Sequence, residues 1–250
     1  MACCPACRAS VRRRRRSSPP RAWIVLFALV VATLPIAALN DGDATTASAT
    51  PVPFPSPVPQ EPPAPPPPPP PIEARIQWRE SIAHGTANTG WLERGVILPE
   101  QGPGFYTYYP YTQTPPNRES RRHGTARLVR GIVELGKWWE TTYAGAPRLG
   151  IGDLSSEGGG DFDLHASHEN GLDVDIRLPR TDGREGQSNP GNYDRRQTQA
   201  IVDFVVGRGA EYVFYGPNLD VHGPGGIVMA WPNHDDHLHV RFPDPDGRGN

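Results

Sequence analysis

The sequence G-D-F-D-L-H-A-S-H-E-N-G-L-D-V-D-I-R-L-P, residues 160–179, is the stretch around which the chain is organised. A second stretch, W-P-N-H-D-D-H-L-H-V-R-F at residues 231–242, has a similar mixture of histidine, carboxylate and alternating apolar residues. Five of the eight histidines lie in these two stretches: His165, His168, His234, His237 and His239. Imidazoles and carboxylates in such density are the ligands that zinc and related divalent metals prefer. We therefore expect the two stretches to meet and to form a metal site.

The seven-residue step from His168 to Asp175 constrains the local fold. Residues seven apart are separated by ~10 Å along a helix axis, and on a strand they lie farther apart and on opposite faces. Ligands of one zinc ion must come within ~4 Å of each other, because each bond is ~2.0–2.2 Å long. If both residues bind the same ion, the chain must reverse between them, and residues 169–171, Glu-Asn-Gly, have the composition of a turn.

Both stretches continue as predicted strands with one apolar and one polar face. In the first strand, Asp173 and Asp175 lie opposite the apolar residues Leu172, Val174 and Ile176. In the second strand, His237, His239 and Arg241 share the polar face. Residues i and i+2 of a strand are ~6.5–7 Å apart. One imidazole can therefore bind a metal while its neighbour points to the space for water and substrate.

The composition divides the chain at about residue 72. Fourteen of the 31 prolines fall in residues 51–71, which predicts that residues 50–71 form a polyproline II linker with a reach of ~60 Å. Residues 72–250 are predicted to form one domain with a sizeable core. This domain has 18 basic and 24 acidic residues, a net charge of −6, and therefore no electrostatic reason to bind nucleic acid. It has no cysteine, which excludes disulfides and a cysteine nucleophile.

Residues 1–49 have the pattern of an export signal. Five consecutive arginines at residues 12–16 precede eighteen uncharged, mainly apolar residues, 22–39. This length fits both a long signal peptide and a short membrane-spanning anchor, so both alternatives stay open. In either case the domain is expected outside the cytoplasm, periplasmic or secreted, and in contact with a membrane only through this segment.

The rest of the domain predicts an α+β fold with a central antiparallel sheet and a few flanking helices. A helix is expected to begin at Thr125, with apolar residues at helical spacing, and a second near Asp194. Strands are expected at residues 149–154, 172–178, 212–215, 227–231 and 237–242. The connections are short, which favours antiparallel pairing.

Three further features of the sequence each allow two interpretations. The aromatic residues in 105–111 can line a substrate groove or form a half-buried strand edge. Asp153, in the sequence Gly-Asp-Leu-Ser, can contact substrate or serve as an ordinary turn residue. His165 and His234 can be functional or structural.

The two stretches together resemble the penicillin-insensitive murein endopeptidases. The motif H-x2-H-x6-D is present at residues 165–175 and H-x2-H-x-H at residues 234–239, with every spacing kept. The similarity extends from about residue 85 to residue 242. The family belongs to the wider group of lysostaphin-type, D-Ala-D-Ala carboxypeptidase and hedgehog folds, so the resemblance implies that fold for this domain.

The resemblance implies His168, Asp175 and His239 as zinc ligands, with the fourth coordination position left to water. His237 would then act as general base or as stabiliser of the tetrahedral oxyanion. His165 and His234 would contact the ligands or the substrate. One zinc ion is expected, and a second ion stays open, because residues 181–194 show no clear counterpart of the additional ligands that some relatives use.

The function implied is that of an exported zinc metallo-endopeptidase. It would cut peptide cross-links of bacterial peptidoglycan, such as that between D-Ala and meso-diaminopimelate. Two alternatives stay open at this point. One is a D,D- or L,D-carboxypeptidase or dipeptidase on the same fold, and the other is a cell-wall-binding module without turnover.

Overall fold

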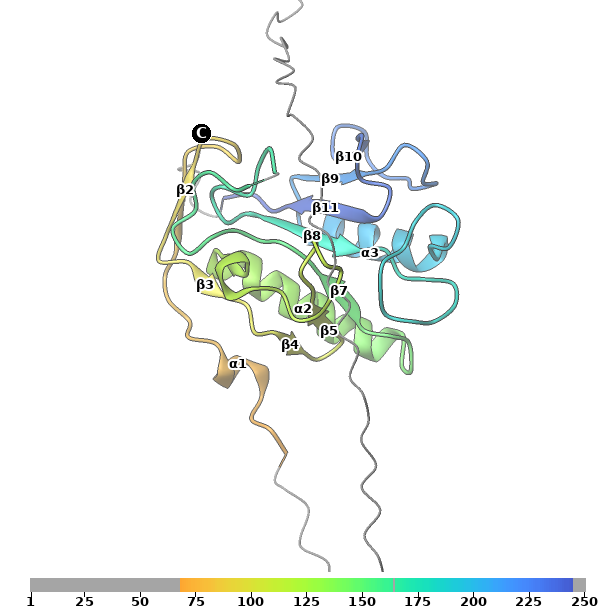
Figure 1. Cartoon of the computed structure of the whole chain (residues 1–250), viewed down its shortest axis with the longest axis horizontal. Coiled ribbons are helices and arrows are strands. Elements are labelled where there is room, and N and C mark those ends of the chain that lie inside the picture. The colour runs from red at the N-terminus through yellow and green to blue at the C-terminus, as the bar shows by residue number, and fades with distance from the viewer. Residues whose placement is uncertain (1–67, 164, 245–250) are drawn as a thin grey trace, which may run out of the picture. The chain divides into compact units, whose positions relative to one another are not determined.

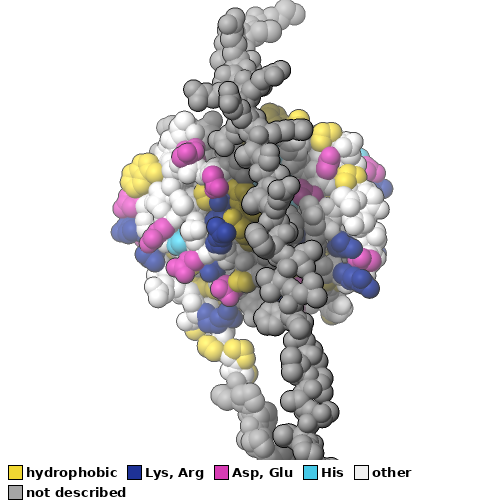
Figure 2. All heavy atoms as spheres, in the orientation of Figure 1, with side chains coloured by type: hydrophobic (Ala, Val, Ile, Leu, Met, Phe, Trp, Pro, Cys, Tyr) yellow, Lys and Arg dark blue, Asp and Glu magenta, His cyan; other side chains and the backbone are white. Residues whose placement is uncertain are grey.

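The computed structural model describes residues 68–163 and 165–244 (Figure 1). The export segment and most of the proline-rich linker, both predicted from the sequence, lie outside the described residues. Within the described residues, no helix combines the length and the apolar character needed to cross a bilayer. On the face seen in Figure 2, acidic and basic side chains lie intermixed.

The described chain contains helices and strands in mixed order, as the sequence predicts. The helices are α1 (Ile72–Arg75), η1 (Glu119–Arg121, a 3-10 helix), α2 (Ala126–Thr142) and α3 (Arg195–Gly207). The early strands are β1 (Ile82–His84), β2 (Trp91–Glu93), β3 (Val96–Ile97), β4 (Gln101–Gly102), β5 (Phe105–Thr107) and β6 (His123–Gly124). The later strands are β7 (Leu149–Ile151), β8 (Asp173–Arg177), β9 (Tyr212–Tyr215), β10 (Val228–Ala230) and β11 (His237–Arg241).

The main sheet has seven strands in the order β10-β9-β11-β8-β7-β5-β4. Its centre, from β9 through β11 and β8 to β7, is antiparallel. The pairs β10–β9 and β5–β7 are parallel, so the sheet is mixed rather than antiparallel throughout. Parallel neighbours need a long crossover. Helix α2 lies in the connection from β5 to β7, and the long segment 216–227 joins β9 to β10. The α+β class is confirmed.

One apolar core joins the helices to one face of the sheet. Val174 and Ile176 of β8 and Leu238 and Val240 of β11 are buried in a single cluster with the apolar sides of α2 and α3. The predicted helix starts are confirmed, because Thr125 and Asp194 are the N-cap residues whose side chains accept backbone hydrogen bonds. The apolar side chains of β8 and β11 point into the core, so the polar side chains of these two strands must face the other side of the sheet.

Candidate metal and active site

The polar faces of β8 and β11 meet at the centre of the sheet. The antiparallel register places His239 opposite Asp175, Arg241 opposite Asp173, and His237 opposite Arg177. Asp175 and His239 are both buried, at 3% and 5% exposure. The two stretches that the sequence singles out therefore lie side by side, as expected.

His168 reaches this face from the loop that precedes β8. The chain reverses at residues with left-handed backbone, His168 (φ 73°) and Gly171 (φ 73°). The turn predicted between His168 and Asp175 is thus present. The Nδ1–H of His168 donates to the carbonyl of Leu154 at 2.5 Å, so the lone pair of this imidazole is on Nε2. Its backbone N–H donates to Asp173 Oδ2 at 3.1 Å, which fixes the loop against β8.

Three ligand-type atoms converge on one point of the site. His168 Nε2 lies 3.1 Å from His239 Nδ1 and 3.3 Å from Asp175 Oδ1, and His239 Nδ1 lies 3.2 Å from Asp175 Oδ1. Donors around a tetrahedral zinc ion with bonds of ~2.0–2.1 Å are separated by ~3.3–3.4 Å. The triangle therefore has the size that three ligands of one such ion require.

His165 belongs to the same cluster. His165, His168 and Asp175 each place one ligand-type atom within 4.8 Å of the others, so this group also can hold a metal ion. The rings of His165 and His168 are 4.5 Å apart. The three atoms of His168, Asp175 and His239 are the tighter set, and both sets share His168 and Asp175.

Opposite charges balance each other within the cluster. Burial disfavours ionisation of Asp175, but His168 and His237 outweigh it and hold the pKa of Asp175 well below its usual range. Burial likewise opposes ionisation of Asp173, yet His239, His168 and Arg241 lower the pKa of Asp173 to about 2. Both carboxylates are therefore ionised at neutral pH and can attract a cation.

His239 lies between these two carboxylates. Burial lowers its pKa, but Asp173 and Asp175 outweigh this effect and raise the pKa of His239 to about 9. Its Nε2 lies 3.4 Å from Asp173 Oδ1, while Nδ1 faces Asp175. A carboxylate behind a metal-binding imidazole orients the ring, and Asp173 has that position.

His237 lies beside the triangle and is held by a carboxylate of its own. Its Nδ1 is 2.7 Å from Asp236 Oδ1, and its Nε2 is 3.8 Å from Asp175 Oδ1. Burial disfavours the charged imidazole, but Asp175 and Asp236 outweigh it and raise the pKa of His237. The ring of His234 is 4.9 Å from that of His237. Burial and the nearby His237 lower the pKa of His234 to about 4, so His234 is neutral at pH 7.

The cluster opens into a cleft of about 670 Å³. His165, Asp175, His234, His237 and His239 all line it. Tyr108 borders it from the segment after β5, whereas Tyr212, Phe214 and Trp231 border it from β9 and the segment after β10. The aromatic residues in 105–111 therefore have different positions. Phe105 and Tyr106 are buried in the fold, whereas Tyr108 lines the cleft.

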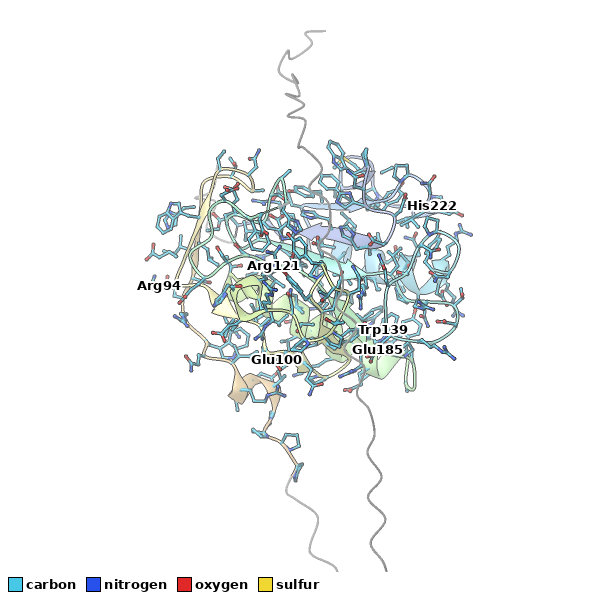
Figure 3. All side chains as sticks on the ribbon, in the orientation of Figure 1. Arg94, Glu100, Arg121, Trp139, Glu185 and His222 are labelled. Atoms are coloured by element: carbon cyan, nitrogen blue, oxygen red, sulfur yellow. The ribbon has the colours of Figure 1, made fainter. Side chains whose placement is uncertain are left out.

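The remaining histidines lie outside the cluster. His84 stacks on Trp91 with ring centres 3.8 Å apart, His123 is buried between β3 and residue 155, and His222 is exposed near the periphery of the molecule (Figure 3).

Two supporting residues were not identified by the sequence reasoning. Asp236 orients His237, and Arg121 binds Asp153 with two hydrogen bonds of 2.9 and 2.7 Å. Asp153 itself is fully buried and bonded to His165 at 2.9 Å, so it is neither an exposed substrate contact nor a simple turn residue. Arg121 lies 32 residues before Asp153 in the sequence, and no local spacing connects the two.

The model of the protein family described as "Penicillin-insensitive murein endopeptidase" matches residues 83–209 of this chain, about half its length. The chain belongs to the penicillin-insensitive murein endopeptidase family. The matched segment contains His165, His168 and Asp175, whereas His234, His237 and His239 follow it in the sequence.

A relative within the murein endopeptidase family has a modest similarity to this chain. The penicillin-insensitive murein endopeptidase of Haemophilus influenzae (strain ATCC 51907 / DSM 11121 / KW20 / Rd) is 32% identical over 95 residues. The alignment covers 38% of this chain and 30% of the relative, so it spans less than a third of the relative's length.

Proposed function

We propose that this protein is an exported zinc metallo-endopeptidase that cleaves peptide cross-links of bacterial peptidoglycan, such as D-Ala to meso-diaminopimelate. The observation that carries the proposal is the triangle of His168 Nε2, Asp175 Oδ1 and His239 Nδ1, with sides of 3.1–3.3 Å; Asp175 and His239 line a large cleft. Family membership supports the substrate class.

His168, Asp175 and His239 would hold one zinc ion in this proposal. When bound, the ion supplies Lewis acidity toward the scissile carbonyl and the attacking water. The orientation of the protein donors supports this assignment. Leu154 keeps the lone pair of His168 on Nε2, and Asp173 lies behind His239.

His237 is the proposed general base. The carboxylate of Asp236 accepts from Nδ1–H, which leaves Nε2 on the side of Asp175 to take the proton of the attacking water. The same nitrogen can return the proton to the amine that leaves when the amide bond breaks. His234, which is neutral at pH 7, and His165 both line the cleft and are proposed to contact the substrate there.

The proposed location is outside the cytoplasm, at the cell wall. It is supported by the arginine-rich start and apolar segment of residues 12–39. The proline-rich segment 50–71 would act as a spacer that lets the domain reach murein if the apolar segment stays in the membrane as an anchor.

The test is incubation of the purified full-length protein with cross-linked murein sacculi, with and without a chelator, followed by mass spectrometry. Release of monomeric muropeptides from dimers, lost with chelator and restored by zinc, is the expected result. Loss of a terminal D-alanine alone would instead assign a carboxypeptidase. Binding to sacculi without any new product would assign a cell-wall-binding module.

A further inference from the structure

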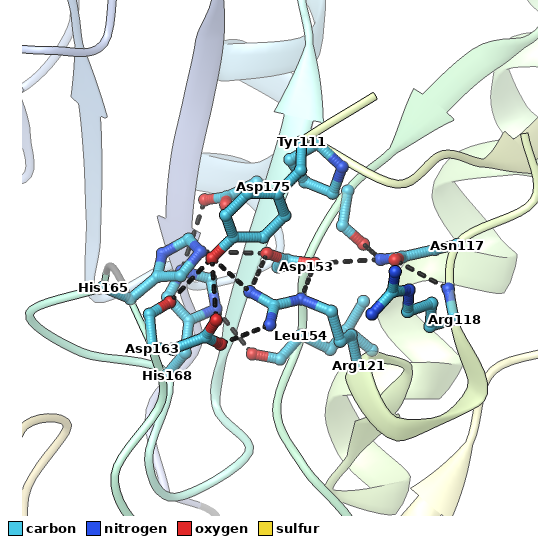
Figure 4. Close-up of polar contacts among 12 residues, drawn as sticks. Tyr111, Asn117, Arg118, Arg121, Asp153, Leu154, Asp163, His165, His168 and Asp175 are labelled. Atoms are coloured by element: carbon cyan, nitrogen blue, oxygen red, sulfur yellow. Dashed lines mark hydrogen bonds and ion pairs between the residues drawn. The ribbon is translucent and has the colours of Figure 1, made fainter. Parts of the chain in front are cut away.

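Arg121 is a buried arginine next to the histidine cluster, and its guanidinium binds two carboxylates. It is the last residue of η1 and is 7% exposed. Its Nε and Nη2 donate to the two oxygens of Asp153 at 2.9 and 2.7 Å, and its Nη1 donates to Asp163 Oδ1 at 2.5 Å (Figure 4). A planar guanidinium that binds one carboxylate with two donors fixes the orientation of that carboxylate.

Asp153, whose orientation is fixed by Arg121, is hydrogen-bonded to His165. The Oδ2 of Asp153 lies 2.9 Å from His165 Nε2, and its Oδ1 accepts from Asn117 Nδ2 at 3.0 Å. An ionised carboxylate only accepts, so His165 donates from its Nε2–H to Asp153. Asp153 is fully buried, and Arg121 is its ion-pair partner of fixed charge.

Arg121 also holds the segment that carries the two histidines of the first motif. The guanidinium lies 4.2 Å from the ring centre of Phe162, and Asp163 follows directly in the sequence. The ring of Phe162 is 5.2 Å from that of His165 and 5.8 Å from that of His168. One arginine thus contacts a ring packed near both histidines, the carboxylate behind His165 and the carboxylate of Asp163.

We propose that Arg121 is a positioning residue of the metal site: through Asp153 and Asp163 it sets the placement of His165 and of the adjoining loop, and metal affinity depends on it. The inference rests on the metal site of the proposed function and not on its substrate. Partners behind metal-site residues typically change metal affinity by ~10–100-fold when removed.

The sharpest test uses Asp163→Asn, because Asp163 is an exposed residue. Its side chain is 71% exposed, so the substitution loosens the anchor without leaving a buried charge unpaired. The matched control is Asp161→Asn, which removes the same charge from an exposed position two residues away. Affinity of the full-length protein for Zn²⁺ and Co²⁺ is measured by competition with a chelator, together with the visible spectrum of bound Co²⁺. We expect ~3–10-fold weaker binding for D163N, because Asp163 acts through Arg121 and does not itself contact a histidine of the cluster, and wild-type binding for D161N.

A second pair of variants tests Arg121 directly. Arg121→Gln should weaken metal binding by ~10–100-fold and change the Co²⁺ spectrum. Arg122→Gln is the control, because Arg122 is equally buried but its Nη1 donates to the carbonyl of Leu98, away from the cluster. The Arg121→Lys variant keeps the positive charge but loses the planar guanidinium that binds Asp153 with two donors. Its metal affinity should therefore lie between that of R121Q and that of the wild-type protein.

Hydrogen exchange of residues 161–168 in the metal-free proteins gives a readout that needs neither metal nor substrate. Faster exchange in D163N than in D161N supports the effect of Asp163 and Arg121 on the placement of the loop, even if the protein cuts no murein. Equal exchange and equal metal affinity in D163N and D161N would overturn the inference. An equal loss of metal affinity in R121Q and R122Q would also overturn it, because the effect would then be general destabilisation.

Discussion

Asp175 and His239 are register partners on neighbouring antiparallel strands, and their Oδ1 and Nδ1 atoms lie 3.2 Å apart. The same register turns Val174 and Val240, also partners, into the core. A slip of one residue would move every side chain of β11 to the other face. The apolar packing that stabilises the sheet therefore also sets the distance between two candidate metal ligands.

Asp175→Asn should abolish high-affinity metal binding. The amide keeps the shape of the carboxylate but loses the negative charge that the triangle offers a cation. We expect zinc affinity to fall by at least ~100-fold, since loss of a ligand exceeds the ~10–100-fold effect of a supporting residue. Isothermal titration calorimetry checks this, with exposed Asp182→Asn as the control. Unchanged affinity in D175N would remove Asp175 from the ligand set.

His237→Ala should separate metal binding from catalysis. The residue lies beside the triangle rather than within it, with its Nε2 3.8 Å from Asp175 Oδ1. Removal of a general base lowers the rate by ~10²–10⁴-fold, so cleavage of cross-linked muropeptides should fall by that factor. Zinc content, measured by elemental analysis, should stay at the wild-type level. His222→Ala, at an exposed position, is the control. If H237A keeps full activity, another group is the base.

His123→Leu should make folding less sensitive to acid. Burial lowers the pKa of His123, so between its folded and unfolded pKa the unfolded chain binds the additional proton. The free energy of unfolding is therefore unaffected by this group above about pH 6.5. It decreases below that pH by up to ~1.4 kcal/mol per pH unit.

Urea unfolding at several pH values tests this prediction. Between pH 7.5 and 5.5 the wild-type protein should lose more stability than H123L. The comparison isolates His123, because the other histidines are common to both proteins. Parallel stability profiles for the two proteins would show that His123 does not cause the acid sensitivity.

Trp231→Ala should weaken substrate binding more than it slows the reaction. The indole is 53% exposed at the cleft and stacks on the ring of Phe214, with ring centres 5.1 Å apart. The ring of Phe214 in turn stacks on that of His239, with ring centres 5.7 Å apart. Loss of an aromatic contact costs ~0.5–1.5 kcal/mol, so KM for cross-linked muropeptides should rise about 2- to 12-fold with little change in kcat. Trp91→Ala is the control, since Trp91 is 48% exposed and does not line the cleft. Equal effects of both substitutions would contradict a specific role.

Much of the fold follows from patterns between neighbouring residues. The N-caps Thr125 and Asp194 and the apolar spacing behind them predict α2 and α3, because helix starts and faces depend on residues within a few positions. The alternation around Asp175 and His239 predicts β8 and β11 for the same reason. The parallel pairing of β5 with β7 was not predicted, since it depends on how the intervening α2 packs on the sheet.

The sequence by itself determined the candidate site residues, because metal-ligand types at fixed spacings, H-x2-H-x6-D and H-x2-H-x-H, are local properties of the chain. Only the tertiary structure decided how they meet: the 3.1 Å approach of His168 to His239 joins residues 71 apart in sequence. Only the structure identified Arg121 and Asp236, because a supporting contact depends on three-dimensional packing and leaves no periodic signal. Strand register, loop reversal and buried charge pairing are long-range properties, and they convert two motifs into one site.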